Sequence, residues 1–218
     1  VTMTDNDHKK TAHKPAPSAA DNCLHINQLS VLRGMVLVIS NLSHQQIAGD
    51  ICCLTGPNGA GKSTLLRTIA GRLPAAGGDI NCAVPVIYIG HTDGLSGAIS
   101  GRANLAGWAK INEFSATENA IDMALSSFAT NRFADLPVRV LSRGQRRRLA
   151  LARLALAPVD SLWLLDEPNA GLDQASKRIL DEIVHKHAST GGMVLAATHL
   201  DFAAAAQPRS LHLPGRVT

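Results

Sequence analysis

The stretch GPNGAGKST at positions 56–64 constrains the fold of this chain more than any other feature. It follows the apolar run ICCLT and precedes KSTLLRTIAGRL, in which the apolar residues have helical spacing. Closely spaced glycines let the backbone turn successive N–H groups toward an anion, and the N-terminus of the following helix adds its dipole. This context predicts a phosphate-binding loop rather than a glycine-rich turn with a chance lysine. The expected nucleotide contacts are Gly56, Pro57, Asn58, Gly59, Ala60, Gly61, Lys62, Ser63 and Thr64.

Two carboxylates follow a second apolar run, LWLLDEP at positions 162–168. This run predicts a buried strand from which Asp166 and Glu167 emerge at the carboxyl end, where open α/β sheets bind ligands. We expect Lys62 to reach the β- and γ-phosphates, Ser63 to ligate Mg²⁺, and Asp166 to hold the ion through its water shell. Glu167 is then expected to orient or deprotonate the attacking water. Without the phosphate loop, such an acidic pair serves equally well as a helix cap or a solvated turn.

A third motif, LSRGQRRRLALARLAL at positions 141–156, predicts a long helix that Ser142 caps. Arg146, Arg147 and Arg148 are expected in its first turn, where the helix dipole disfavours cations by about 0.3–1 kcal/mol each. A sequence that accepts this cost indicates a bound anion at that helix end. The alternative is a solvated basic face.

The remaining pattern predicts one α/β domain over residues 23–218, preceded by a disordered tail over residues 1–22. A chain of 218 residues can bury roughly 70% of its unfolded surface in one such domain. Short apolar runs separated by polar turns such as SHQQIAGD predict hairpins before residue 51. An alanine-rich stretch at about 94–155 predicts an inserted helical subdomain, and the βα alternation that follows predicts a mostly parallel sheet.

Composition excludes several classes of protein. The richest apolar stretch, LALARLALAPVDSLWLL, is interrupted by Arg153, Pro158 and Asp160, so no membrane-spanning helix is expected. The four cysteines lack the paired spacing of a zinc site and are typical of a reducing compartment, which points to the cytoplasm. The net charge is only +4, and no block of one sign argues for a nucleic-acid groove.

The motifs beyond the tail resemble, in order, those of the nucleotide-binding domain of ABC transporters: GPNGAGKST, LSRGQ, LWLLDEP, NAGLD and AATHLD. The resemblance implies an α/β P-loop ATPase fold with a mixed sheet core, an antiparallel β subdomain and an inserted helical subdomain, using ATP and Mg²⁺. It also implies a head-to-tail homodimer of ATPase subunits. In that dimer Ser142, Gly144 and Gln145 contact the nucleotide held by the other copy, Asp173 lies across the interface, and His199 is the switch at the γ-phosphate.

The chain departs from the family pattern at three positions. Arg143 replaces the first signature glycine, and its charge either reaches phosphate or faces solvent. The segment VLRGMV offers Arg33 where the family usually stacks an aromatic ring on adenine. His91 stands where the family usually has a glutamine that senses Mg²⁺ and couples to the membrane subunit. A neutral imidazole can accept the same contact, or His91 only caps the strand end.

Within the family, IGHTDGL, LSRGQRRRLALARL and GGMVLAATHLD together resemble the ATP-binding subunit of the haem exporter of cytochrome c maturation. That resemblance implies a peripheral protein on the cytoplasmic side of the inner membrane, bound to separate integral membrane subunits. Two alternatives stay open: the ATPase subunit of another ABC transporter, and a soluble ABC-type ATPase acting on DNA or ribosomes. The last is disfavoured because the chain has no coiled-coil insertion and no second cassette.

Overall fold

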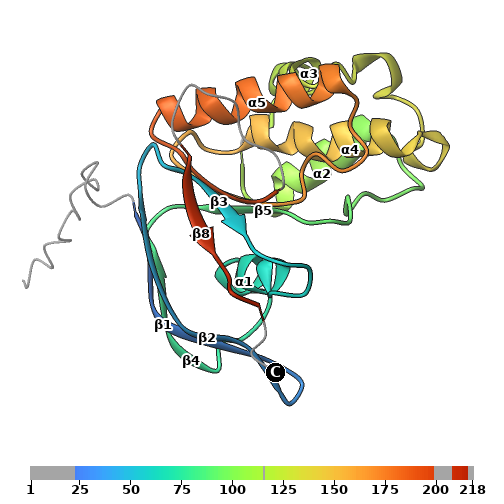
Figure 1. Cartoon of the computed structure of the whole chain (residues 1–218). Helices are drawn as coiled ribbons and strands as arrows, with labels where there is room; N and C mark the ends of the chain where they lie inside the picture. Colours follow the sequence, from blue (N-terminus) through green and yellow to red (C-terminus); the bar gives the residue numbers. More distant parts are fainter. Residues whose placement is uncertain (1–22, 115, 199–207, 216–218) are drawn as a thin grey trace, which may run out of the picture.

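The computed structural model describes residues 23–114, 116–198 and 208–215, which form two sheets and a set of helices (Figure 1). The predicted tail over residues 1–22 lies outside the described residues. An antiparallel sheet has the order β2-β1-β4, with β1 at Cys23–Arg33, β2 at Val36–Ile47 and β4 at Gly77–Cys82. A second sheet has the order β5-β6-β7-β3-β8, and all its pairs are parallel. Its strands are β5 Val86–Ile89, β6 Leu162–Asp166, β7 Met193–Ala197, β3 Ile51–Thr55 and β8 Arg209–His212.

The helices divide between the two faces of the parallel sheet (Figure 1). Helix α1 lies on the same side as the antiparallel sheet, and helices α2 to α5 lie on the other side. Their bounds are α1 Lys62–Ile69, α2 Gly101–Ile111, α3 Glu118–Ser127, α4 Arg143–Leu151 and α5 Gln174–Ser189. Short 3₁₀ helices span Asn131–Phe133, Val138–Val140 and Ala152–Leu156.

Strand β6 shows why the parallel sheet is buried on both faces. Its side chains alternate, so that Leu162 and Leu164 pack in the core that contains α1 and β1. Trp163 and Leu165 pack in the other core, among the helices α2 to α5. This two-sided burial makes each central strand a continuous apolar run, and it leaves the carboxyl ends of the strands for polar residues.

Two expected elements were wrong in extent. The segment predicted as the polar turn SHQQIAGD is mostly strand, because β2 continues to Ile47. There the buried Gln46 donates to the carbonyl oxygens of Asp50 and Val194. The long helix expected over 141–156 is α4 followed by a 3₁₀ segment. Strands β4 and β8 were not anticipated, because GGDINC and RSLH carry little β pattern of their own.

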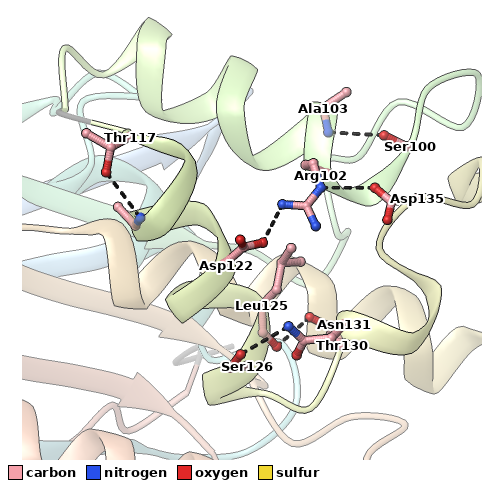
Figure 2. A network of polar contacts seen from close by, with 11 residues as sticks. Ser100, Arg102, Ala103, Thr117, Asp122, Leu125, Ser126, Thr130, Asn131 and Asp135 are labelled. Carbon is pink, nitrogen blue, oxygen red and sulfur yellow. Dashed lines mark hydrogen bonds and ion pairs between the residues drawn. The ribbon is translucent and has the colours of Figure 1, made fainter.

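The segment between β5 and β6 is helical and is braced by a polar network (Figure 2). Arg102 of α2 bonds to Asp122 of α3 at 2.5 Å and to Asp135 at 3.0 Å. Ser100 and Thr117 cap α2 and α3. Treating 94–155 as a separate subdomain stays a prediction. Within the described residues, no helix combines the length and apolar character needed to cross a bilayer.

Candidate nucleotide-binding site

The phosphate loop joins the end of β3 to the start of α1 and takes a conformation that requires glycine. Gly56 and Gly61 have φ values of 135° and 101°, a region that side chains rarely allow. A Cβ at Gly56 would collide with the carbonyl oxygen of Leu213. The Lys62 ammonium folds back over the loop and donates to the carbonyl oxygens of Gly56 at 2.7 Å and Pro57 at 3.0 Å. The loop therefore presents a cation and a helix N-terminus to the same space, which suits an anionic phosphate chain.

A pocket of about 360 Å³ opens beside this loop. It brings together six of the nine expected loop residues, the expected adenine contact Arg33, and Glu167. The residues lining it are Arg33, Val38, Asn58, Gly59, Gly61, Lys62, Ser63, Thr64 and Glu167. Segments far apart in the sequence thus surround one cavity that holds two cations and one carboxylate.

The oxygen atoms of Ser63 and Asp166 meet at the edge of this pocket. The Ser63 hydroxyl donates to Oδ1 of Asp166 at 2.8 Å, and Asp166 is only 2% exposed. On its other oxygen Asp166 accepts from the hydroxyl of Tyr88 at 3.4 Å, and Tyr88 in turn accepts from Nε of Arg67 at 3.4 Å. A hydroxyl and a carboxylate side by side are the oxygen ligands that Mg²⁺ prefers.

Tyr88 is a site residue that the sequence reasoning missed. The signal available was weak: it is the only tyrosine in the chain and stands in a predicted strand. Arg72 also lies over its ring, with the guanidinium carbon 4.7 Å from the centroid. Tyr88 therefore ties Asp166 to the basic end of α1.

Glu167 lies just beyond β6 with φ at +47°, a left-handed conformation that is costly for a residue with a side chain. Its N–H donates to the carbonyl oxygen of Ala197 at the end of β7, at 2.8 Å. The side chain is partly buried and lines the pocket beside Lys62 and Ser63. The backbone at this turn is held in an unfavourable state that directs the carboxylate toward the phosphate loop.

The three arginines of the LSRGQRRR segment all donate to main-chain carbonyl oxygens. Helix α4 begins at Arg143, so they lie in its second turn, not its first. Arg146 donates to the carbonyl oxygen of Leu141, and Arg148 donates to that of Ala129. Arg147 is buried and also bonds to carbonyl oxygens. The placement of all three arginines in the first turn was wrong, and a bound anion at this helix end stays a prediction.

The signature segment, LSRGQ at positions 141–145, forms a capped helix end. Ser142 caps α4 as predicted: its hydroxyl accepts from the N–H of Gln145 at 3.2 Å, and Gln145 Oε1 accepts from the N–H of Ser142 at 2.8 Å. Gly144 approaches Gly171 closely enough that an added Cβ would lie 3.0 Å from the Gly171 carbonyl oxygen. The Arg143 side chain packs along Gly171, and its Nε would lie 3.4 Å from a Cβ added to that glycine. Arg143 therefore contacts the NAGLD turn within its own chain.

Two further predicted site residues, Asp173 and His91, are not among the residues that line the pocket. Asp173 caps α5 by accepting from the N–H of Ser176 at 2.7 Å. His91 is exposed, two residues past the end of β5, and is not among the residues that line the pocket. His199 lies outside the described residues. Just before it, Thr198 accepts from the amide of Asn169, which links the NAGLD turn to the end of β7.

A glycine-rich loop between a strand and a helix, with an acidic pair at the end of the neighbouring strand, defines a P-loop nucleotide-binding domain. The model of the ABC transporter family matches residues 39–170, more than half of the chain. The chain therefore belongs to the ABC transporter family and is an ATP-binding, ATP-hydrolysing domain. The predicted family, fold and enzyme class are confirmed.

Among curated proteins, the chain is similar to ATP-binding export proteins of cytochrome c biogenesis. The chain is 39% identical over 196 residues to the cytochrome c biogenesis ATP-binding export protein CcmA of Paramagnetospirillum magneticum, covering 84% of this chain and 90% of that protein. It is 43% identical over 188 residues to CcmA of Chelativorans sp., covering 81% and 91%. Among solved structures, an ABC transporter ATP-binding protein from Pyrococcus furiosus has a TM-score of 0.74 at 24% identity, covering 88% of this chain and 97% of that one. This last likeness concerns the fold.

Proposed function

We propose that this chain is the ATP-hydrolysing subunit of an ABC-type haem exporter required for cytochrome c biogenesis. The observation that carries the proposal is the single pocket that Lys62, Ser63 and Glu167 share, with Asp166 bonded to Ser63 at its edge. The two relatives described above, both named cytochrome c biogenesis ATP-binding export proteins, support the assignment of the transport process.

Each pocket residue has a distinct part in the proposed hydrolysis. The Lys62 ammonium leaves its two loop carbonyls to neutralise the β- and γ-phosphates. Ser63 and Asp166 hold Mg²⁺, which when bound neutralises charge on the phosphates. The Glu167 carboxylate orients the attacking water or accepts its proton. Arg33, which lines the same pocket, stacks on the adenine.

The proposed assembly is a head-to-tail homodimer. In it, the capped end of α4 with Ser142, Gly144 and Gln145 covers the γ-phosphate of the nucleotide on the other copy. Ser142 is exposed at that helix end, as this requires. Asp173 lies across the interface and His199 contacts the γ-phosphate.

The proposed partners are integral membrane subunits that carry the haem, and the chain binds them peripherally on the cytoplasmic side of the inner membrane. His91 senses Mg²⁺ and couples hydrolysis to these subunits; its exposure beyond β5 leaves it accessible. Nucleic acid is not a partner. Membrane association through partners agrees with a relative named as an export protein.

The test replaces Glu167 by glutamine in the only copy of the gene and stains membrane proteins of the host cells for covalently bound haem. Loss of covalent haem, with non-covalent haem proteins unchanged, is the expected result. Glu182→Gln makes the same chemical change on the exposed face of α5 and should have no effect. Unchanged covalent haem in the Glu167→Gln cells would assign the ATPase to the export of another cargo.

A further inference from the structure

The buried side chain of Arg147 donates to four main-chain carbonyl oxygens near the pocket. The side chain is only 3% exposed. Nη2 donates to the carbonyl oxygens of Asp166 at 3.1 Å and Glu167 at 2.9 Å, and Nε donates to that of Pro168 at 3.1 Å. Nη1 donates to the carbonyl oxygen of Gly90 at 2.8 Å. One side chain of α4 thus binds three consecutive carbonyls around Glu167 and the residue that precedes His91.

A buried cation is costly unless its donors are satisfied. Burial lowers the pKa of Arg147, and the nearby carboxylate of Asp93, 3.4 Å from Nη1, acts against that shift. A hydrophobic residue of similar size would fill the same space without this cost. The guanidinium is distinguished from such a residue by its planar fork, which can bond several fixed acceptors at once.

The two bonds from Nη2 act on the strained residue directly. They reach the carbonyls on both sides of the Glu167 Cα, so they restrain the two peptide planes whose rotation sets the direction of the carboxylate. Glu167 needs such restraint because its φ of +47° is unfavourable. Because Arg147 belongs to α4, the restraint also joins Glu167 to the helix whose first residues form the signature segment.

We propose that Arg147 is a positioning residue for ATP hydrolysis: it holds the Glu167 turn in its left-handed conformation and ties that turn to helix α4. The inference rests on the proposed role of Glu167 as the residue that activates water. It predicts a loss in turnover without a matching loss in nucleotide affinity, since Arg147 does not line the pocket.

Arg153 provides a matched control. It is also buried, at 7% exposed, and burial lowers its pKa to about 10. Its guanidinium donates to the carbonyl oxygens of Asp93 and Gly94, in the loop beyond β5, and to none at the Glu167 turn. A loss that came only from disturbing a buried arginine would affect both positions alike.

The experiment compares Arg147→Lys, Arg147→Gln and Arg153→Lys in the complex isolated through a tag on this chain. Lysine keeps the charge but has one nitrogen, and glutamine removes the need to bury a charge. For both Arg147 variants we expect kcat for ATP to fall at least roughly 10-fold, because a misplaced catalytic group is this costly. The dissociation constant of a fluorescent ATP analogue should change less than about 2-fold. Arg153→Lys should keep kcat within about 3-fold once rates are normalised to the folded fraction.

The same Arg147 substitutions in a Glu167→Gln background separate positioning from general support. A residue that acts through Glu167 has nothing left to position there, so the residual rate and the ATP-induced dimer should not change further. Equal losses in both backgrounds, a parallel loss of affinity, or an equal fall in Arg153→Lys would overturn the inference. Wild-type turnover in Glu167→Gln alone would instead refute the proposed role of Glu167.

Discussion

The phosphate loop and the Glu167 turn face the same pocket but are built in different ways. In the loop, Lys62 bonds to carbonyls five and six positions earlier in the chain. At the Glu167 turn, the backbone is held by Arg147, 20 positions away, and by Ala197 at the end of a neighbouring strand. Arg147 also reaches Gly90, 57 positions away.

The phosphate loop is held by residues close in sequence, whereas the Glu167 turn is held by residues from distant elements. Glycines and a helix N-terminus suffice to shape the loop, because its bonds lie within one strand–loop–helix unit. The Glu167 turn exists only when β5, β6, β7 and α4 have packed together. Removing the cation of the loop should therefore act on nucleotide binding, and changes near the turn on turnover or on the stability of the surrounding fold.

The largest effect is expected from Lys62→Ala. Removing the ammonium deletes charge-assisted bonds to phosphate, and we expect ATP affinity to fall by roughly 100-fold while the fold is retained. Fluorescent-nucleotide titration and thermal unfolding measure the two quantities. Lys110→Ala, at the exposed end of α2, is the control and should bind as wild type. Normal ATP binding by Lys62→Ala would contradict the view that this loop alone sets nucleotide affinity.

A smaller effect is expected from Gly61→Ala. The added Cβ would lie 2.8 Å from Cγ1 of Val38 in a residue with φ of 101°, so both backbone strain and a clash oppose it. We expect a loss of about 1–3 kcal/mol in the free energy of unfolding. Gly59→Ala meets no atom within 4 Å and adds strain alone, so its loss should be smaller. Denaturant unfolding distinguishes the two, and equal losses would contradict the role of the Val38 contact.

Ser142→Ala sharpens the comparison at the signature end of α4. It removes one half of the reciprocal cap with Gln145, and we expect a loss of about 1 kcal/mol in the free energy of unfolding. Ser142→Asn, which can still cap, should recover most of it. The melting temperatures of the purified variants test this. A full loss with asparagine would mean that the hydroxyl serves something other than the cap.

The smallest effect is a dependence of stability on pH at the start of β6. His187 stacks on Trp163 with ring centroids 3.6 Å apart, and burial lowers its pKa. The unfolded chain binds this proton more tightly, so the stabilising contribution is complete above about pH 6.5 and is lost as the pH falls through the lowered pKa of the folded state. Melting temperatures of His187→Gln should show a weaker decline below that pH than those of His25→Gln, an exposed histidine. Equal declines would exclude His187 as the source.

Much of the fold and of the site was predictable because it depends on short sequence patterns. The helices at 101–111 and 118–127 begin at caps that the sequence displays, and the central strands are continuous apolar runs. The polar end of β2 was missed because it is held in the sheet by pairing with β1, and its own residues carry no strand pattern. Tyr88 was missed as a site residue, and the bonds of Arg147 to the Glu167 turn were not anticipated, because the partners of both side chains lie in other elements.

By itself, the amino-acid sequence determined the phosphate loop, the acidic pair and the ABC transporter family, because each depends on residues that are neighbours along the chain. Only the tertiary structure decided that Arg147 holds the main-chain carbonyls around Glu167, and that Arg143 packs on Gly171. The physical reason is that a buried guanidinium must find its acceptors wherever packing supplies them. That choice depends on how β5, β6 and α4 meet, which no short stretch of sequence encodes.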